Sequence, residues 1–166
     1  TAPGDGIELY NGRTSSTNAN NLIVRYMRMR TGRQVSGSDN IDAGGAAYGH
    51  DQIYDHCSFT WGTDECFSLN NDKQPKGLYN ITLQNSILGQ GCQNHSCGGL
   101  VQTSDKEGVT VFRNLFIDNK TRNFKVKGLN QFVNNVIYNW GNGAAYNMGG
   151  ESSGHSNTVI ENNYFI

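Results

Sequence analysis

The sequence predicts an all-β protein, a right-handed single-stranded parallel β-helix in which short strands stack coil upon coil. Three observations favour this fold. The chain of 166 residues has 21 glycines, two prolines and many asparagines, a composition typical of a protein with many turns. No segment shows a long amphipathic helical pattern. A phrase of apolar, polar and small residues also recurs along the chain, and recurrence at about 20 to 50 residues indicates a solenoid.

The recurring phrase marks six coils. Its copies are Leu22–Met29, Ile53–Phe59, Ile81–Leu88, Val109–Phe116, Gln131–Tyr138 and Val159–Phe165. Each copy combines β-branched or aromatic residues, which favour strands, with one residue at a bend. The bend residues are Tyr26, His56, Asn85, Asn114, Asn135 and Asn163, at spacings of 21 to 30 residues. Each coil is then about three short strands separated by turns, with coils ~4.8 Å apart.

Asparagine at the bend has a physical reason. It tolerates the left-handed backbone conformation, and its amide can bond to the same amide in the coils above and below. We therefore expect an asparagine ladder through Asn85, Asn114, Asn135 and Asn163. An antiparallel sandwich is the alternative, but it requires hairpin turns, and the hairpin signal Asn-Gly occurs only twice in the chain.

A third strand follows each bend, and charged residues appear there. Asp64 and Arg122 both lie eight residues after their bends, which are His56 and Asn114. Stacking of coils therefore places Asp42, Asp64 and Arg122 on one face. The two aspartates are expected about one coil apart, and Arg122 roughly two coils beyond Asp64.

The segment Lys120–Gly128 has four cations in nine residues, although the formal net charge of the chain is only −1. It directly follows Val109–Ile117, which has the composition of a buried strand. The cations therefore lie just after a strand on a rigid scaffold, where we expect a local anion site. A solvated run of charges is the alternative interpretation.

Two carboxylates about 5 Å apart repel each other unless one is protonated or a cation bridges them. Ligands that are all oxygen favour calcium, and a calcium ion with only two or three protein carboxylates keeps positions open for substrate. We therefore expect Asp42 and Asp64 to bind Ca²⁺. The alternative is that both are exposed turn residues that cap backbone amides. Calcium beside a cation cluster is suited to an acidic sugar polymer.

Composition and charge limit the other classes of function. No apolar run approaches the length of a membrane span. With a sequence pI near 6.4 and no arginine-rich arm, nucleic-acid binding has little support.

We expect one catalytic domain over residues 1–166. The chain starts without a signal peptide and ends inside the apolar run Asn163–Ile166, so we expect it to be truncated at both ends.

The four cysteines are an even number, which allows disulfides in a secreted protein. Cys92 and Cys97 enclose a short loop, and we expect a bridge between them. Cys57 and Cys66 lie in or beside strand-like segments and can be ordinary buried thiols.

Two stretches together resemble a known family. Ile53–Glu65, which includes Asp-His-Cys-Ser-Phe and Trp-Gly-Thr-Asp-Glu, and the later Arg122–Gly128 resemble the pectate lyases. The resemblance extends from about Leu22 to Ile166. It implies a secreted, monomeric parallel β-helix enzyme that uses Ca²⁺ to cleave polygalacturonate by β-elimination.

The resemblance also assigns metal ligands and structural residues. Asp42 and Asp64 match calcium-binding aspartates of the family, whereas Thr60 occupies a place where the family often has a further acid. Glu65 is a weak substitute, because adjacent strand residues point to opposite faces. Asp55 and His56 belong to the signature, but their place at the bend favours a structural role.

Arg122 matches the first arginine of the family motif Arg-x-Pro-x-x-Arg, the residue implied to remove a proton. Phe124 occupies the proline place and Lys127 the second arginine place; lysine keeps the charge but loses the bidentate fork. An arginine accepts a proton only if its pKa is lowered. Lys125 and Lys127 are expected to contact the substrate carboxylate, and His95 in its loop to contact the polymer.

Other interpretations stay open at this point. A polygalacturonase-type hydrolase on the same fold would use two carboxylates, for which Asp42, Asp64 and Glu65 are candidates. A lyase for methyl-esterified pectin would not need calcium. A non-catalytic β-solenoid for adhesion or carbohydrate binding would keep the ladder without the charged column.

Overall fold

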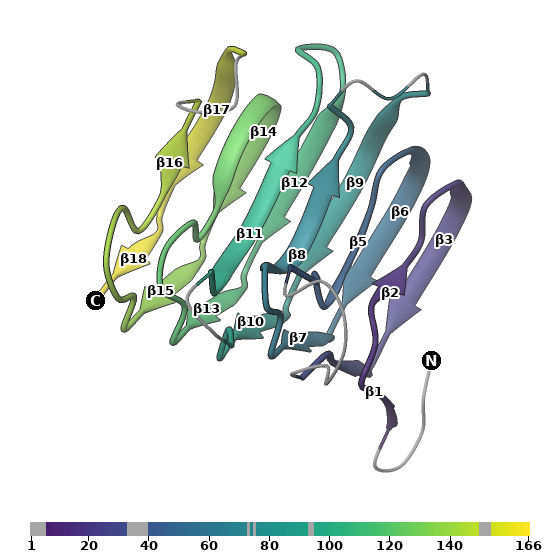
Figure 1. Cartoon of the computed structure of the whole chain (residues 1–166). Coiled ribbons are helices and arrows are strands. Elements are labelled where there is room, and N and C mark those ends of the chain that lie inside the picture. The colour runs from purple at the N-terminus through teal and green to yellow at the C-terminus, as the bar shows by residue number, and fades with distance from the viewer. Residues whose placement is uncertain (1–5, 33–39, 73, 75, 93–94, 150–153) are drawn as a thin grey trace.

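The computed structural model describes residues 6–32, 40–72, 74, 76–92, 95–149 and 154–166. These residues form a β-solenoid of about five turns, and none of them is helical. The coils follow one another along a single axis, with β3 near one end and the C-terminus at the other (Figure 1). The predicted all-β solenoid of stacked parallel strands is confirmed.

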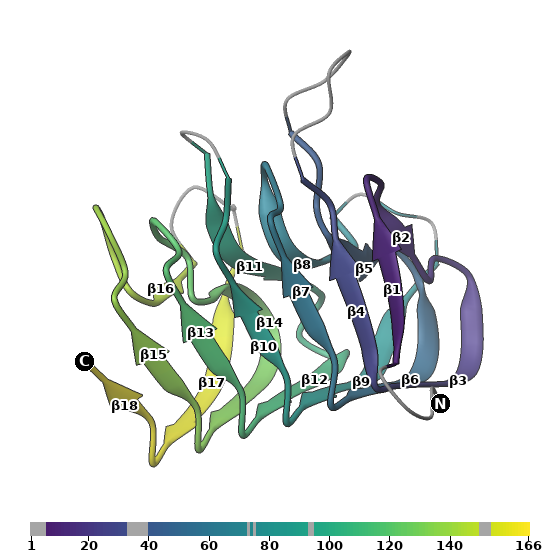
Figure 2. The same cartoon turned by 90° about the horizontal axis from the view of Figure 1, so that it is seen from below.

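The strands lie in three columns, which we call sheets A, B and C. Sheet A is seen in Figure 2 and contains β1 (Ile7–Tyr10), β4 (Met27–Arg30), β7 (Ser58–Thr60), β10 (Ile87–Gly89), β13 (Leu115–Ile117), β15 (Val136–Tyr138) and β18 (Tyr164–Phe165). Its strands pair in parallel, so each coil adds one short strand to the column.

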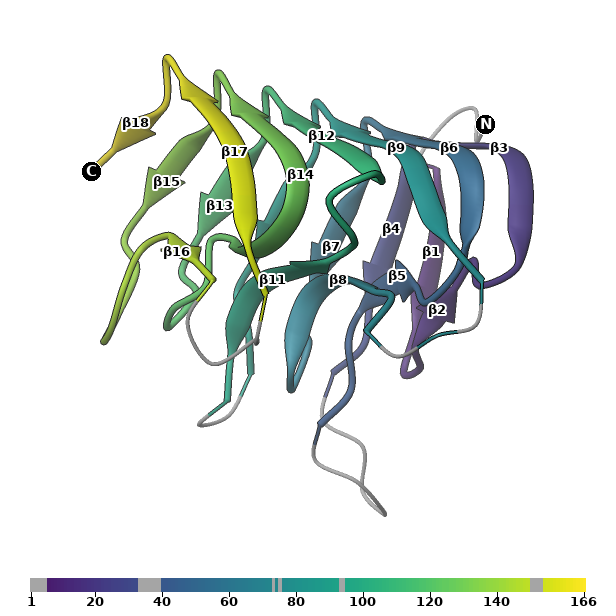
Figure 3. The ribbon, with the colours of Figure 1, turned by 90° about the horizontal axis from the view of Figure 1, so that it is seen from above.

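Sheets B and C complete each coil. Sheet B contains β2 (Thr14–Ser15), β5 (Gly44–Ala46), β8 (Glu65–Asn70), β11 (Cys97–Gln102), the first part of β14 (Lys125–Val133) and β16 (Asn147–Met148). Sheet C is seen in Figure 3 and contains β3 (Ala19–Arg25), β6 (Gly49–Asp55), β9 (Leu78–Gln84), β12 (Gly108–Phe112), the second part of β14 and β17 (Ser156–Glu161). The chain therefore visits the sheets in the order B, C, A.

Strand β14 belongs to both sheets because Gly128 lets it turn the corner without a break. Residues before Gly128 pair with β11, and residues from Gly128 onward pair with β17. The backbone of Gly128 has φ +83°, and a Cβ atom there would lie 2.4 Å from the carbonyl oxygen of Thr103. Only glycine accepts both this conformation and this close approach.

Aromatic rings fill the interior of the solenoid. Tyr54, Phe59 and Phe67 contact one another with ring centroids 4.7–6.1 Å apart. Further along the axis, Phe124 packs against Phe116 at 5.2 Å. The ring of Phe124 also covers Gly99 of β11, where a Cβ atom would lie 1.9 Å from it. Such edge-to-face contacts add to the stabilisation from buried apolar area.

The predicted asparagine ladder through four residues is not shown. Asn114 Nδ2 donates to Asn135 Oδ1 at 3.1 Å, and Asn135 Nδ2 donates to Asn163 Oδ1 at 3.0 Å. In the preceding coil the equivalent position is Ser86, whose N–H donates to Asn114 Oδ1 at 3.0 Å. Asn85 lies one residue earlier, in the left-handed conformation (φ 48°). The left-handed residue of this turn comes one position before the ladder residue. The sequence pattern did not distinguish these two positions.

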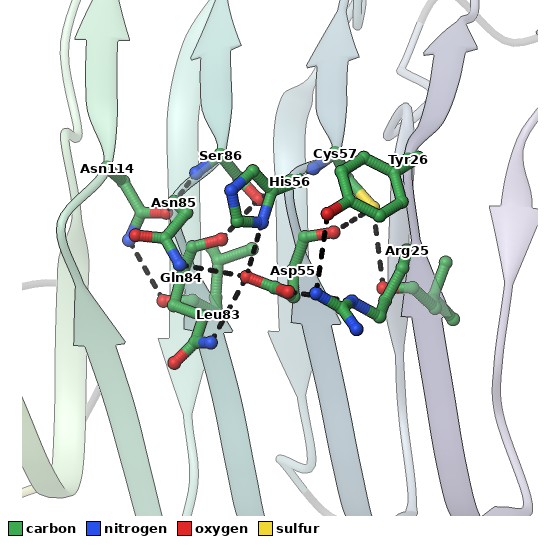
Figure 4. Close-up of polar contacts among 11 residues, drawn as sticks. Arg25, Tyr26, Asp55, His56, Cys57, Leu83, Gln84, Asn85, Ser86 and Asn114 are labelled. Carbon is green, nitrogen blue, oxygen red and sulfur yellow. Dashed lines mark hydrogen bonds and ion pairs between the residues drawn. The ribbon is translucent and has the colours of Figure 1, made fainter. Parts of the chain in front are cut away.

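The side chain of Asp55 lies at the centre of a polar network beside the ladder (Figure 4). It is 6% exposed and accepts hydrogen bonds from His56 Nδ1 and Asn85 Nδ2, both at 2.8 Å, and from Gln84 Nε2 at 3.1 Å. Arg25 Nε forms an ion pair with Asp55 at 2.8 Å. Burial alone would raise the pKa of Asp55, but these hydrogen bonds lower it. The contacts join three successive coils, which supports a structural role for Asp55 and His56.

We expect Asn114→Ala to lower the free energy of unfolding by ~1–3 kcal/mol, because buried partners lose their hydrogen bonds. Asn114 is 3% exposed, and its Nδ2 also donates to the carbonyl oxygen of Leu83 at 2.9 Å. Thermal and denaturant unfolding measure the loss. Asn157→Ala on the exposed surface of β17 is the control and should change stability by less than about 0.5 kcal/mol. Equal stability of wild type and Asn114→Ala would contradict a stabilising row of amides.

The expected bridge between Cys92 and Cys97 is wrong, because all four cysteines are free thiols. The two residues are tied to different places: the Cys92 N–H donates to the carbonyl oxygen of Gly62, and the Cys97 N–H to that of Asp64. The expectation that Cys57 and Cys66 are buried thiols is confirmed. Among the described residues, no helix could span a membrane.

Candidate functional site

The candidate site lies where the coils pass from sheet A to sheet B. Asp42 precedes β5, Asp64 directly precedes β8, His95 precedes β11 and Arg122 precedes β14. These connections leave the strands of sheet A along one edge of the solenoid, the upper edge in Figure 2. Backbone hydrogen bonds join them, as where the Cys97 N–H donates to the Asp64 carbonyl oxygen at 2.9 Å. Coil stacking thus gathers residues far apart in sequence.

Three carboxylates meet at this edge. Oxygen atoms of Asp42, Asp64 and Glu65 all lie within 4.8 Å of one another, and we call these residues the carboxylate cluster. Asp42 Oδ1 accepts a hydrogen bond from the Glu65 N–H at 3.2 Å, and Asp42 Oδ2 lies 3.2 Å from Arg13. The expectation that Glu65 points away from Asp64 is wrong. Strand β8 begins at Glu65, so Asp64 belongs to the connection and the alternation of a strand does not apply.

Two of the three carboxylates have an arginine partner, Arg13 beside Asp42 and Arg122 beside Glu65, and burial still dominates their pKa values. Burial raises the pKa of Asp42, although Arg13 opposes the shift. The pKa of Glu65 is raised to about 8, mainly by burial. The hydrogen bond with Asp64 and the negative charges of Asp64 and Asp42 act in the same direction. A divalent cation would offset the repulsion among these carboxylates. Three oxygen donors within reach of one point suit Ca²⁺, so the residues present fit this metal.

We expect the metal-free protein to lose stability as the pH rises from about 5 to about 8. The folded-state pKa of Glu65 lies above its ordinary value, so its stabilising contribution is complete below about 4.5 and is lost as the pH passes through about 8. Melting temperatures in the presence of a chelator should therefore fall over this range. Glu65→Gln mimics the protonated form and should flatten the profile. An unchanged slope in Glu65→Gln would exclude Glu65 as its cause.

Arg122 reaches the cluster from two coils away. Its Nη1 lies 2.6 Å from Glu65 Oε1, and its side chain is 21% exposed. Burial would lower the pKa of Arg122, but Cys97 and the carboxylates of Glu65 and Asp64 outweigh burial and raise it. In the metal-free protein the guanidinium is therefore protonated. For Arg122 to accept a proton, the negative charge of its neighbours must first be neutralised.

The three residues expected to bind substrate occupy different positions. Lys125 is 7% exposed and lines a cavity of about 520 Å³ together with Arg122, Thr121 and Asn147. Lys127 Nζ lies outside this lining and forms an ion pair with Asp72 Oδ1 at 2.8 Å. The cavity is in the size range of small-ligand sites. It places Lys125 beside Arg122, whereas Lys127 would have to exchange Asp72 for a substrate carboxylate.

His95 lies at the carboxylate cluster. Its Nε2 is 3.1 Å from Asp64 Oδ1, and the side chain is 48% exposed. The sequence predicted that His95 lies in a loop, but it did not predict the contact with Asp64. Thr60, at the place of a further acid in the family, is buried at the end of β7.

Comparison with known proteins finds homologues along the whole chain. No protein-family model matches the chain. Over its whole length the chain is 55% identical to a protein of Aspergillus flavus and to one of Aspergillus fumigatus, and 53% identical to one of Emericella nidulans, all three named probable pectate lyase C. It spans 37% of the length of the first two and 36% of the third. The chain is therefore homologous, from end to end, to proteins named probable pectate lyase C, and the resemblance of its sequence to pectate lyases is confirmed.

Proposed function

We propose that the protein is a calcium-dependent pectate lyase that cleaves α-1,4-polygalacturonate by β-elimination. The observation that carries this proposal is the meeting of Asp42, Asp64 and Glu65 with Arg122 at one edge of the solenoid. The name of the homologues supports the same activity. Pectate is a polymer of the cell exterior, so we further propose a secreted enzyme that acts as a monomer. Its formal net charge of −1 gives no support for a nucleic-acid partner.

The reaction needs an acidic proton and a stabilised negative charge. The proton next to the uronate carboxylate is removed, and the oxygen on the neighbouring carbon leaves as the double bond forms. Calcium bound by Asp42 and Asp64, with Glu65 as a third ligand, would neutralise the substrate carboxylate and acidify this proton. Lys125 in the adjoining cavity provides a further positive charge for the carboxylate.

Arg122 is the proposed proton acceptor. Its ion pair with Glu65 fixes the guanidinium at the edge of the cavity. The pKa of Arg122 is raised in the metal-free protein by Cys97, Glu65 and Asp64 against the effect of burial. Neutralisation of the two carboxylates by a cation removes part of this effect, so proton removal by Arg122 requires the loaded site and alkaline conditions.

One observation favours a second candidate, a hydrolase. Burial raises the pKa of Glu65 to about 8, as hydrolases require of a general acid, and Asp64 and Asp42 lie within 4.8 Å of it. The ion pair with Arg122 works against this role, because it favours the ionised form of Glu65. The lyase remains the better supported function.

The deciding experiment is an assay of the intact protein on polygalacturonate, with and without a calcium chelator. A lyase produces unsaturated ends, so the ultraviolet absorbance should rise with calcium present and stop rising after chelation. A rise in reducing ends without absorbance would identify the hydrolase. The same rise in absorbance with methyl-esterified pectin as the substrate, unaffected by the chelator, would identify a pectin lyase. Binding of polymer without any product would leave the non-catalytic solenoid.

A further inference from the structure

We propose that Cys97, His95 and Glu65 form a binding site for a thiophilic divalent cation such as Zn²⁺, and that this site shares Glu65 with the carboxylate cluster. The thiol of Cys97, a ring nitrogen of His95 and a carboxylate oxygen of Glu65 lie within 4.8 Å of one another. Cys97 begins β11, Glu65 begins β8, and the two are paired in register in adjacent coils. The fold therefore fixes the distance between them.

The donor set distinguishes this site from the carboxylate cluster. Sulfur, imidazole nitrogen and one carboxylate suit Zn²⁺ or Co²⁺, whereas calcium prefers oxygen alone. Bonds of about 2.3 Å to sulfur and about 2.0 Å to nitrogen place tetrahedral ligands roughly 3.3–3.8 Å apart, so a small contraction completes the site. His95 can provide it, because its side chain is 48% exposed while Cys97 and Glu65 are buried.

The two sites cannot be filled independently. Both sites include the carboxylate of Glu65, which already binds Arg122 at 2.6 Å. Both cations would draw on this one carboxylate, and Zn²⁺ would also draw the imidazole of His95 away from Asp64, 3.1 Å from it. Binding of a thiophilic cation should therefore weaken calcium binding, and calcium should weaken the thiophilic cation by the same factor.

The cation must displace the proton of Cys97. Burial raises the pKa of this thiol to about 12, although Arg122 opposes the shift. Thiolate ligands of metals are deprotonated, so binding releases a proton and strengthens with rising pH.

The test is a titration of the intact, metal-free protein with Co²⁺ alone, read by absorption. A thiolate ligand gives cobalt a charge-transfer band in the near ultraviolet, which carboxylates do not. We expect this band in the wild type and its loss in Cys97→Ser. Even the loss of an outer-shell partner weakens metal binding about 10- to 100-fold, so binding in Cys97→Ser should fall by more than about 100-fold.

Two variants make the outcome decisive. Cys92→Ser removes a half-buried thiol outside this group and should keep the band. His95→Ala changes an exposed side chain, so it should fold normally and bind Co²⁺ at least about tenfold more weakly. No band in the wild type, a band that persists in Cys97→Ser, or loss of the band in Cys92→Ser would overturn the assignment. If Cys97→Ser does not fold, an unchanged Co²⁺ affinity in His95→Ala would overturn it.

A second measurement concerns the effect on activity and rests on the proposed function. The rate on polygalacturonate is measured at fixed calcium, with and without Zn²⁺. The result is expressed as the rate with Zn²⁺ divided by the rate without it. The ratio should fall below one for the wild type and return to one as calcium is raised. A ratio of one at all Zn²⁺ concentrations that fill the site would refute the shared Glu65 while leaving Co²⁺ binding intact. Absence of any lyase rate would refute the proposed function alone.

Discussion

Arg122→Lys should lower kcat on polygalacturonate about 10²- to 10⁴-fold, the range that a general base contributes. In the wild type, Arg122 Nη1 lies 2.6 Å from Glu65 Oε1. Lysine keeps a positive charge beside Glu65, so the fold and calcium binding should be retained. The shorter amine cannot take the planar guanidinium's position relative to the substrate proton. Initial rates over a range of substrate concentrations, at a fixed excess of calcium, separate kcat from KM.

A purely anchoring role predicts a different result. If Arg122 only bound the substrate carboxylate, lysine would retain part of the attraction and the change would appear mainly in KM. Near-normal kcat at saturating polygalacturonate would therefore end the assignment of Arg122 as the base. Lys127→Ala is the matched comparison, because Lys127 lies in β14, which follows Arg122, and is paired with Asp72. We expect it to raise KM and leave a measurable kcat.

Asp64→Asn should weaken calcium binding by about tenfold or more, which corresponds to ~1.4 kcal/mol or more. The amide keeps the shape of the side chain but removes one of the three negative charges of the carboxylate cluster. Added calcium should restore part of the activity, because the remaining ligands, Asp42 and Glu65, are unchanged. Asp42→Asn should behave in the same way. Isothermal titration calorimetry measures the affinity directly.

The control for Asp64→Asn is Asp105→Asn. Asp105 is an exposed turn residue outside the carboxylate cluster, so its loss should leave calcium affinity unchanged. Equal calcium affinities in wild type, Asp64→Asn and Asp42→Asn would remove both aspartates from the metal site. A loss of affinity of the same size in Asp105→Asn would show that only net charge matters.

The solenoid was predictable because the phrase that forms each coil recurs along the sequence. Each coil needs apolar residues that face inward and a residue that tolerates the left-handed turn, and both recur at the spacing of a coil. The assignment of individual bend residues was less secure. Asn85 and Asn114 occupy similar places in their phrases, yet Asn85 is the left-handed residue and Ser86 takes the ladder position. A shift of one residue changes the direction of every side chain that follows.

The cysteines show another limit of local sequence. Proximity along the chain favoured a bridge between Cys92 and Cys97, but a disulfide requires the two side chains to point toward each other. Each backbone is bonded to a different part of the neighbouring coil, and both thiols are free. Pairing across coils, rather than loop length, decides where each thiol lies.

The sequence by itself determined the all-β solenoid, the stacking of coils and the gathering of Asp42, Asp64 and Arg122 on one edge, because a recurring phrase places equivalent residues of successive coils side by side. Only the tertiary structure decided which neighbours join them. Glu65 enters the cluster because β8 begins there, and Arg122 binds it across the intervening coil. These contacts depend on where each strand starts and how far each side chain reaches, which no periodicity in the sequence specifies.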